Sequence, residues 1–401
     1  MPDMEFYKAL VQPSDHKLLL VVMDGLGGCP RQPDSRTELE TAKTPTLDAL
    51  ARDSICGLLD PVAPGVTPGS GPAHLALFGY DPIKHQIGRG VLSALGVDLE
   101  LKHSDVPARI NFCTLSPDGK VIDRRAGRIE TELNQKLIDK LSQIRVAGVQ
   151  IILKTEKEHR AAVIFRGKDL YGDLTDSDPQ AIGVPPKKVE ATNPRARHTA
   201  EIANEFIRQA LELLKSEHPA NGILMRGFDR YEGLPMMTET YGLRCAAIAT
   251  YPMYRGVARL VGMEVLQTGS TVSDELGTLR EHLAHFDYIY LHIKHTDECG
   301  EDGDFDGKVR TIEEIDRDLA PLTKMPISVI AVTGDHSTPS ILKAHSWHPV
   351  PVLLRSPYCR ADAVTEFGEG ACAAGALGHM PAKYLLPLML ANALRLKKFG
   401  A

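Results

Sequence analysis

The run Lys17-Leu-Leu-Leu-Val-Val-Met-Asp-Gly-Leu-Gly-Gly, residues 17 to 28, decides the fold class of this chain. Its unbroken aliphatic stretch predicts a strand that is buried on both faces, which is typical of the parallel sheets of α/β proteins. The strand is expected to end at Asp24, where the glycines that follow let the backbone approach a ligand closely. Three later runs have the same aliphatic character: Tyr288 to Ile293, Ile327 to Val332 and Val350 to Leu354.

Helical patterns alternate with these strands. Thr44 and Pro45 resemble a helix start and predict a helix over residues 46–52. Thr199 is expected to cap a second helix, and residues 308–319 form a third, amphipathic one. This alternation predicts a mostly parallel sheet sandwiched by helices, with its functional groups beyond the carboxyl ends of the strands.

The length of 401 residues predicts two domains. Residues 99–234 are rich in arginine and in turn-forming residues, and we expect them to form a smaller α/β domain inserted into the first. The main, catalytic domain is then discontinuous and consists of residues 1–98 and 235–401.

The charge and the cysteines limit the classes of partner. A net charge of -6 gives no reason to expect nucleic acid or an acidic membrane as a partner. The seven cysteines are scattered and never form a CxxC pair, which favours reduced thiols. The N-terminal residues show no signal-peptide pattern, so we expect a cytoplasmic protein. The sequence does not indicate an oligomeric state.

Carboxylates follow three of the expected strands. Asp24, Asp297 and Asp335 lie just past strand ends, and His336 and His345 add imidazole nitrogens. These are ligand types of Zn²⁺ and Mn²⁺ in catalytic sites. Each residue taken alone would more often be a helix cap or a solvated loop residue. Their combination at one edge of a sheet predicts a site for two metals, which can clamp the oxygens of a phosphoryl transfer.

Ser70 is the candidate nucleophile. It lies between Gly69 and Gly71 and directly before a helical run, with Pro72 suited to the first turn. Free amides and the dipole at such a helix start favour phosphate. A simple helix cap is the commoner role of a serine in this position. A metal beside its oxygen would lower the hydroxyl pKa enough for attack.

Several motifs, in the same order along nearly the whole chain, resemble the archaeal-type, cofactor-independent phosphoglycerate mutases of the alkaline phosphatase superfamily. They include Met23-Asp24-Gly25-Leu26-Gly27-Gly28, Thr44-Pro45-Thr46-Leu47-Asp48, Pro68-Gly69-Ser70, Asp123-Arg124-Arg125-Ala126-Gly127-Arg128, Gly334-Asp335-His336-Ser337-Thr338-Pro339 and His345-Ser346.

This resemblance implies an alkaline-phosphatase-like core, a phosphoserine intermediate and two divalent metals, commonly Mn²⁺, with Zn²⁺, Co²⁺ or Mg²⁺ as alternatives. It implies that one metal is held by Asp24, Ser70, Asp335 and His336. The other is then held by Asp297, His345 and the residue four positions after that aspartate. In this chain that residue is Glu301, where archaeal members are expected to carry a histidine. His348 is an alternative to His345.

The implied substrate is a phosphoglycerate, which carries both a phosphate and a carboxylate. Arginine binds such groups through paired hydrogen bonds. Arg124, Arg128 and Arg226 of the insert are the expected substrate-binding residues. Arg255 is a fourth and stands where the family usually carries a lysine. Asp123 is a candidate for proton transfer to and from the glycerate hydroxyls.

Two other functions remain open from the sequence. A metal-dependent phosphatase, or a phosphotransferase acting on a substrate such as homoserine, would use the same scaffold and metals. An inactive metal-binding protein is the second alternative. Gly71-Pro72 stand where the family often has acidic or hydroxyl residues, which leaves room for a changed substrate.

Overall fold

The computed structural model describes residues 4–33 and 35–400, and the chain divides into two compact units. Unit 1 comprises Met1–Gln86, Pro235–Tyr251 and Val261–Ala401, and unit 2 comprises Ile87–Leu234 and Pro252–Leu260. Residues 1–3, which belong to the stretch read for a signal peptide, lie outside the described residues.

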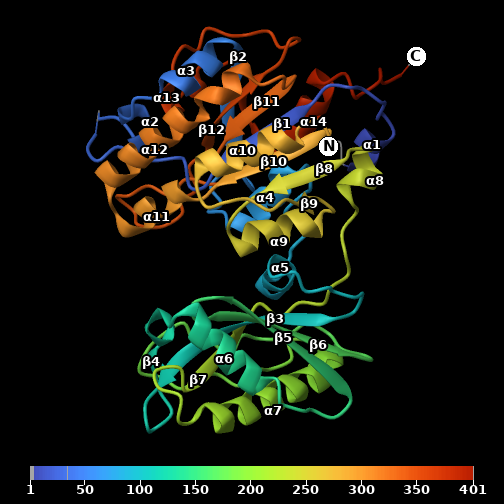
Figure 1. Ribbon diagram of the computed structural model, residues 1–401, viewed down its shortest axis with the longest axis vertical. Coiled ribbons are helices and arrows are strands. Elements are labelled where there is room, and N and C mark those ends of the chain that lie inside the picture. Colours follow the sequence, from blue (N-terminus) through green and yellow to red (C-terminus); the bar gives the residue numbers. More distant parts are fainter. Residues whose placement is uncertain (1–3, 34, 401) are drawn as a thin grey trace. The chain divides into compact units, whose positions relative to one another are not determined.

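The central element of unit 1 is an eight-stranded sheet (Figure 1). The strands β11, β1, β10, β8 and β9 run parallel to one another, as do β13 and β2, whereas β12 pairs antiparallel with β11 and with β2. The mostly parallel sheet predicted from the aliphatic runs is therefore confirmed. In sheet order the strands are β13 (Gly378–Pro381), β2 (Ser54–Asp60), β12 (Val350–Arg355), β11 (Val329–Thr333), β1 (Leu18–Met23), β10 (Tyr288–Ile293), β8 (Cys245–Ile248) and β9 (Glu264–Val265).

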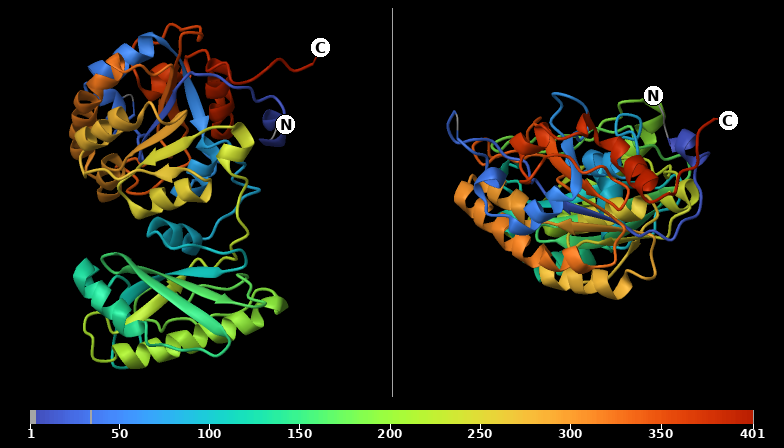
Figure 2. Two further views of the ribbon diagram at one scale, coloured as in Figure 1. Left: turned by 45° about the vertical axis from the view of Figure 1, so that its right-hand side comes forward. Right: turned by 90° about the horizontal axis from the view of Figure 1, so that it is seen from above.

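Helices cover both faces of this sheet (Figures 1 and 2). Alternate residues of β1, such as Leu19 and Val21, join a core with apolar residues of α3, α10 and α12. The helices of unit 1 are α1 (Met4–Lys8), α2 (Glu38–Thr41), α3 (Pro45–Arg52), α4 (Ser70–Leu77), α8 (Met237–Tyr241), α10 (Val272–His282), α11 (His295–Asp302), α12 (Phe305–Leu319), α13 (Glu369–Ala373) and α14 (Leu385–Asn392), with 3-10 turns at Ala320–Lys324 and Ala382–Tyr384.

Unit 2 is built on an antiparallel sheet with its own core. Its strands are β3 (Val106–Leu115), β4 (Val121–Asp123), β5 (Val149–Lys157), β6 (Arg160–Gly167) and β7 (Gly222–Arg226). The helices α6 (Thr131–Leu141) and α7 (Arg197–Leu214) contribute to the core of one face. Unit 2 also contains 3-10 turns at Ala126–Arg128 and Pro194–Ala196.

The boundaries of the insert differ from those expected. Unit 2 begins at residue 87 and not at residue 99, and it includes the short return segment 252–260. The reason is a close pair of helices, α5 (Arg89–Gly96) and α9 (Pro252–Leu260). Gly96 and Gly256 lie against the backbone of the opposite helix with no room for a β-carbon, so this pair forms one compact body.

The predicted cap at Thr199 is wrong. Helix α7 begins at Arg197, because Asn193 caps the preceding 3-10 turn and the chain continues from that turn into the helix. Thr199 is buried inside the helix, where its hydroxyl accepts a hydrogen bond from the amide of Tyr171. Among the described residues, no helix is both long enough and apolar enough to cross a membrane.

Candidate active site

The carboxyl ends of three neighbouring parallel strands carry the predicted acidic residues. Asp24 follows β1, Asp335 and His336 follow β11, and Asp297 lies in α11, just past β10. Two groups of potential metal ligands form there, and the ligand atoms of each group lie within 4.8 Å of one another. The first group is Asp24, Asp335 and His336, and the second is Asp297, His336 and His345.

Ser70 lies beside the first group. It is the first residue of α4, after Gly69 as N-cap, and its Oγ lies 3.3 Å from Nε2 of His336. One turn later His74, which is fully buried, donates from Nδ1 to the carbonyl of Ser70 over 2.8 Å. The same nitrogen is 3.5 Å from Oδ2 of Asp335. His74 therefore holds the start of α4 and lies beside the acidic group, a position that the sequence analysis missed.

The first group has the electrostatics of a cation site. Asp24, Asp335 and His336 are fully buried. Burial raises the pKa of Asp335 to about 8, and the negative charge of Asp24 adds to this effect. Oδ2 of Asp335 accepts no hydrogen bond from any described residue, although the His336 ring is 3.2 Å away. A buried carboxylate oxygen without a donor, next to a second carboxylate, fits a divalent cation.

The second group shares His336 with the first. The rings of His336 and His345 stack with centroids 3.6 Å apart, and Nε2 of His345 lies 3.7 Å from Oδ1 of Asp297. Nδ1 of His345 is hydrogen-bonded to the carbonyl of Pro68 over 3.0 Å. His348, the alternative ligand, instead contacts the thiol of Cys29 and the hydroxyl of Ser346.

Glu301 does not join either group. It follows Asp297 by one turn of α11, as the spacing predicted, but its side chain is exposed to solvent. A spacing of four residues puts Glu301 on the same side of the helix as Asp297, but it could not fix how far the side chain turns inward. Its role as a metal ligand stays a prediction.

Lys294 is a site residue that the sequence analysis missed. Its Nζ lies 2.9 Å from Oδ2 of Asp24 and 2.8 Å from Oδ2 of Asp297, so it bridges the two groups. These two carboxylates raise its pKa although burial opposes the charged form. Its position directly after the aliphatic strand β10 is a signal that could have identified it.

A buried lysine fixes the loops that carry the ligands. Nζ of Lys308, a residue with no exposed surface, donates to the carbonyls of Gly25, Gly27 and Thr338 over 2.8–2.9 Å. These carbonyls belong to the loops after Asp24 and after His336. One side chain therefore connects the two loops that carry the candidate ligands and orients them toward each other.

In unit 2, Asp178 holds two of the predicted substrate-binding arginines. Nε and Nη2 of Arg124 donate to its two carboxylate oxygens over 3.0 and 2.7 Å, and Nη1 of Arg226 lies 3.5 Å away. Asp178 is buried, and Arg124 lowers its pKa against the effect of burial. The Asp176-Ser177-Asp178 stretch in an arginine-rich segment was a signal for this role that the sequence analysis did not use.

Asp123 supports a strained turn. Its carboxylate oxygens accept hydrogen bonds from the amides of Arg125 and Gly127 over 2.8 and 2.6 Å. The turn places Ala126, Gly127 and Arg128 at φ values of 46°, 65° and 53°, all left-handed. Arg128 is exposed beyond this turn. The structure thus shows a supporting role for Asp123, and its part in proton transfer stays a prediction.

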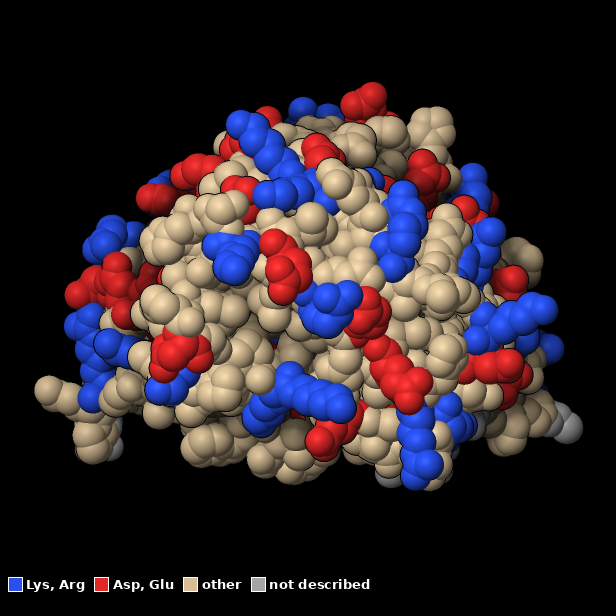
Figure 3. All heavy atoms as spheres, turned by 90° about the horizontal axis from the view of Figure 1, so that it is seen from below, with Lys and Arg blue, Asp and Glu red and all other residues tan. Residues whose placement is uncertain are grey.

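The arginines of unit 2 create a local positive field within a surface of mixed charge. His159 is buried, and burial together with four arginines lowers its pKa to about 3; the arginines are Arg109, Arg125, Arg128 and Arg160. The face drawn in Figure 3 mixes basic and acidic side chains, consistent with the small net charge. Arg255, in α9, lies 3.3 Å from a carboxylate oxygen of Asp98.

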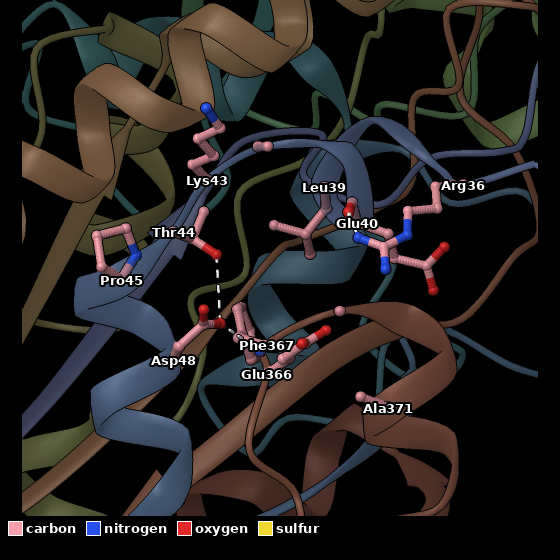
Figure 4. Close-up of a pocket in the computed structure, with 12 residues that line it drawn as sticks. Arg36, Leu39, Glu40, Lys43, Thr44, Pro45, Asp48, Glu366, Phe367 and Ala371 are labelled. Atoms are coloured by element: carbon pink, nitrogen blue, oxygen red, sulfur yellow. Dashed lines mark hydrogen bonds between the residues drawn. The ribbon is translucent and has the colours of Figure 1, made fainter.

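Unit 1 also contains a hollow. It has a volume of about 630 Å³, and some of the residues in the ranges 36–48 and 366–371 line it. Figure 4 shows Asp48 facing Thr44 and the backbone of Phe367, to both of which it is hydrogen-bonded. The predicted site residues do not line it.

Comparison with known proteins agrees with this geometry. Residues 51–221 match the family model of 2,3-bisphosphoglycerate-independent phosphoglycerate mutase. A probable mutase of this type from Thermus thermophilus is 50% identical over 399 residues, 98% of each chain. One from Aquifex aeolicus is 48% identical over 408 residues, 99% of this chain and 100% of the relative.

Two solved structures show the same architecture. A protein from Pyrococcus horikoshii aligns with a TM-score of 0.84 and 32% identity, covering 97% of this chain and 100% of its own. A cofactor-independent phosphoglycerate mutase from Thermoplasma acidophilum aligns with a TM-score of 0.70 and 29% identity, covering 94% and 100%.

The fold and the sequence relationships define an isomerase of α/β architecture. The chain belongs to the 2,3-bisphosphoglycerate-independent phosphoglycerate mutase family. This confirms the family predicted from the sequence motifs. The relationships favour a mutase over a phosphatase, a homoserine phosphotransferase or an inactive protein.

Proposed function

We propose that this chain interconverts 3-phosphoglycerate and 2-phosphoglycerate through a phosphoserine at Ser70. The observation that carries the proposal is the position of the Ser70 hydroxyl. It lies at the first residue of a helix, 3.3 Å from His336, next to two groups of metal ligands. The amides at this helix start favour the negative charge of an arriving phosphate.

The donor set supports two divalent cations, for which Mn²⁺ is our first choice and Zn²⁺, Co²⁺ and Mg²⁺ are alternatives. Asp24, Ser70, Asp335 and His336 would hold one cation, and Asp297 and His345, with Glu301 as a further candidate, would hold the other. When bound, the cations would lower the pKa of the serine hydroxyl and neutralise the charge of the transferring phosphoryl group. The buried acidic groups described above fit this demand.

The chemistry needs two transfers of one phosphoryl group. In the first, a bond forms between Oγ of Ser70 and phosphorus while the bond from phosphorus to O3 of the substrate breaks. In the second, O2 of the retained glycerate bonds to phosphorus and the bond to Oγ breaks. The proton that leaves Oγ of Ser70 in the first transfer goes to O3 of the glycerate. The proton that leaves O2 in the second transfer goes to Oγ, so both steps balance and the mutase consumes no water.

The glycerate must be held between the two transfers. Arg124, Arg128, Arg226 and Arg255 are the proposed contacts for its carboxylate and phosphate, because guanidinium groups bind both through paired hydrogen bonds. Asp178, which orients Arg124 and lies near Arg226, supports this assignment. Asp123 is the proposed group for moving protons between the glycerate hydroxyls. The scattered free cysteines support action in the cytoplasm.

The test is an assay of the full-length protein with Mn²⁺ and 3-phosphoglycerate. We expect 2-phosphoglycerate to form without release of free phosphate, and Ser70→Ala to show essentially no turnover. Free phosphate as the only product would instead establish the phosphatase alternative. Full activity in Ser70→Ala would contradict the assignment of the nucleophile.

A further inference from the structure

The hydroxyl of Thr338 is hydrogen-bonded to both groups of metal ligands. Its Oγ1 lies 2.9 Å from Nδ1 of His336 and donates to Oδ1 of Asp297 over 2.8 Å. Thr338 is fully buried, and its own carbonyl accepts a hydrogen bond from Lys308. Gly25, at φ 64°, packs so closely on Oγ1 that a β-carbon there would lie 2.7 Å from it.

The direction of these two hydrogen bonds fixes the proton on His336. An ionised carboxylate only accepts, so the Thr338 hydroxyl must use its single proton toward Asp297. The hydroxyl oxygen can then only accept from His336, which places the imidazole proton on Nδ1. Nε2 is then the nitrogen of His336 that is open to a cation, and it faces Asp24, Asp335 and Ser70 at 3.4, 3.2 and 3.3 Å.

The second histidine is oriented in the same way by different means. Nδ1 of His345 donates to the backbone carbonyl of Pro68, so its Nε2 is likewise the nitrogen open to a cation. Of these two histidines, His336 is the one oriented by a side-chain hydroxyl, that of Thr338. The same hydroxyl also orients Asp297 of the second group. A histidine that binds a metal is commonly fixed in this manner by a partner on its other nitrogen.

We infer that Thr338 is a positioning residue that sets the tautomer of His336 and couples the two groups, so that loss of its hydroxyl weakens cation binding in both. The inference rests on the proposed function, because it presupposes that these groups hold two cations. Without the hydroxyl, Nδ1 of His336 would have no acceptor, the ring could adopt the other tautomer, and Asp297 would lose the donor that orients it.

The experiment compares Mn²⁺ binding by titration calorimetry in metal-free, full-length protein. For Thr338→Val, which keeps the shape and removes the hydroxyl, we expect both affinities to fall by about 10- to 100-fold. Thr338→Ser keeps the hydroxyl and should bind close to wild type. Thr199→Val is the matched control, since it removes another buried threonine hydroxyl within unit 2 and should leave Mn²⁺ binding unchanged.

The outcomes separate the inference from the proposed function. If wild type binds fewer than two Mn²⁺ ions, the proposed function fails. If wild type binds two and Thr338→Val binds them equally well, or loses affinity for one only, the inference alone fails. If Thr338→Ser lost as much Mn²⁺ affinity as Thr338→Val, the inference would also fail, because Thr338→Ser keeps the hydroxyl to which the loss is attributed.

A second measurement keeps the inference testable even where Thr338→Val does not fold. Nitrogen-15 spectra of histidine-labelled, metal-free wild type report the tautomer of each ring, and His336→Asn identifies the signal of His336. We expect His336 to carry its proton on Nδ1. A proton on Nε2 would overturn the inference.

Discussion

Ser70 differs from an ordinary serine at a helix start through its neighbours and not through its own conformation. Nε2 of His336 is 3.3 Å from its hydroxyl, and His74, which lies beside Asp335, donates a hydrogen bond to its carbonyl. The sequence motif could identify the serine. It could not show Lys294 or Thr338 as links between the two groups, because those contacts depend on which side chains turn inward beyond the strand ends.

Also at the scale of a residue, Asp178→Asn is expected to raise the KM for 3-phosphoglycerate by about tenfold or more, with a smaller effect on kcat. The change removes one half of a charged, two-point contact with Arg124, and hydrogen bonds to charged groups contribute about 1.5–3 kcal/mol. Steady-state kinetics checks the split between KM and kcat.

Asp118→Asn is the matched control for that experiment. Asp118 lies in the same unit and pairs with Lys120, but both side chains are exposed to solvent. It should leave both kinetic constants near wild type. An unchanged KM in Asp178→Asn would show that Arg124 does not depend on this carboxylate for its orientation.

At the scale of elements, aliphatic runs predicted the central strands well. The run at residues 288–293 matches β10, and the run at 17–23 matches β1 within one residue. Helix starts were harder. Thr44 does precede α3, but it forms no side-chain cap, and the start of α7 was set by Asn193 and not by Thr199. Several nearby residues can cap the same helix start, and one sequence alone does not show which of them does so.

Glu275, in helix α10, gives a prediction about pH. Burial, reinforced by Asp274, raises its pKa to about 8. Between the ordinary pKa of a glutamate and about 8, the Glu275 carboxyl is therefore protonated in the folded state and ionised in the unfolded state. The free energy of unfolding should fall as the pH rises toward about 8, by up to about 1.36 kcal/mol per pH unit.

Chemical unfolding of Glu275→Gln at several pH values checks this expectation. The variant should lose this part of the pH dependence and should be more stable than wild type above pH 8. Glu281→Gln, an exposed position of the same helix, should keep the wild-type profile. Parallel profiles for Glu275→Gln and wild type would contradict the assignment.

At the scale of the whole molecule, the chain forms two units that each have a hydrophobic core. The sequence predicted the insertion from its arginine-rich composition. It could not assign α5 and α9 to unit 2, because their association depends on the close approach of Gly96 and Gly256, which are far apart in the sequence.

Because each unit has its own hydrophobic core, we expect the two units to unfold in separate thermal transitions. Both ligand groups belong to unit 1, so Mn²⁺ should stabilise unit 1 alone, by about 2.7 kcal/mol at 100 times the dissociation constant. Calorimetry should resolve two transitions, of which only one rises with Mn²⁺ and falls again with a chelator. An equal shift of both transitions would contradict this prediction.

The most direct measurement of the central claim is a search for phosphoserine. Full-length protein with Mn²⁺ and 3-phosphoglycerate is quenched in acid during turnover, and its peptides are analysed by mass spectrometry. We predict one phosphoryl group on Ser70, and none on the corresponding peptide of Ser70→Ala. Turnover with no phosphate on Ser70, or with the phosphate on a different residue, would contradict the account.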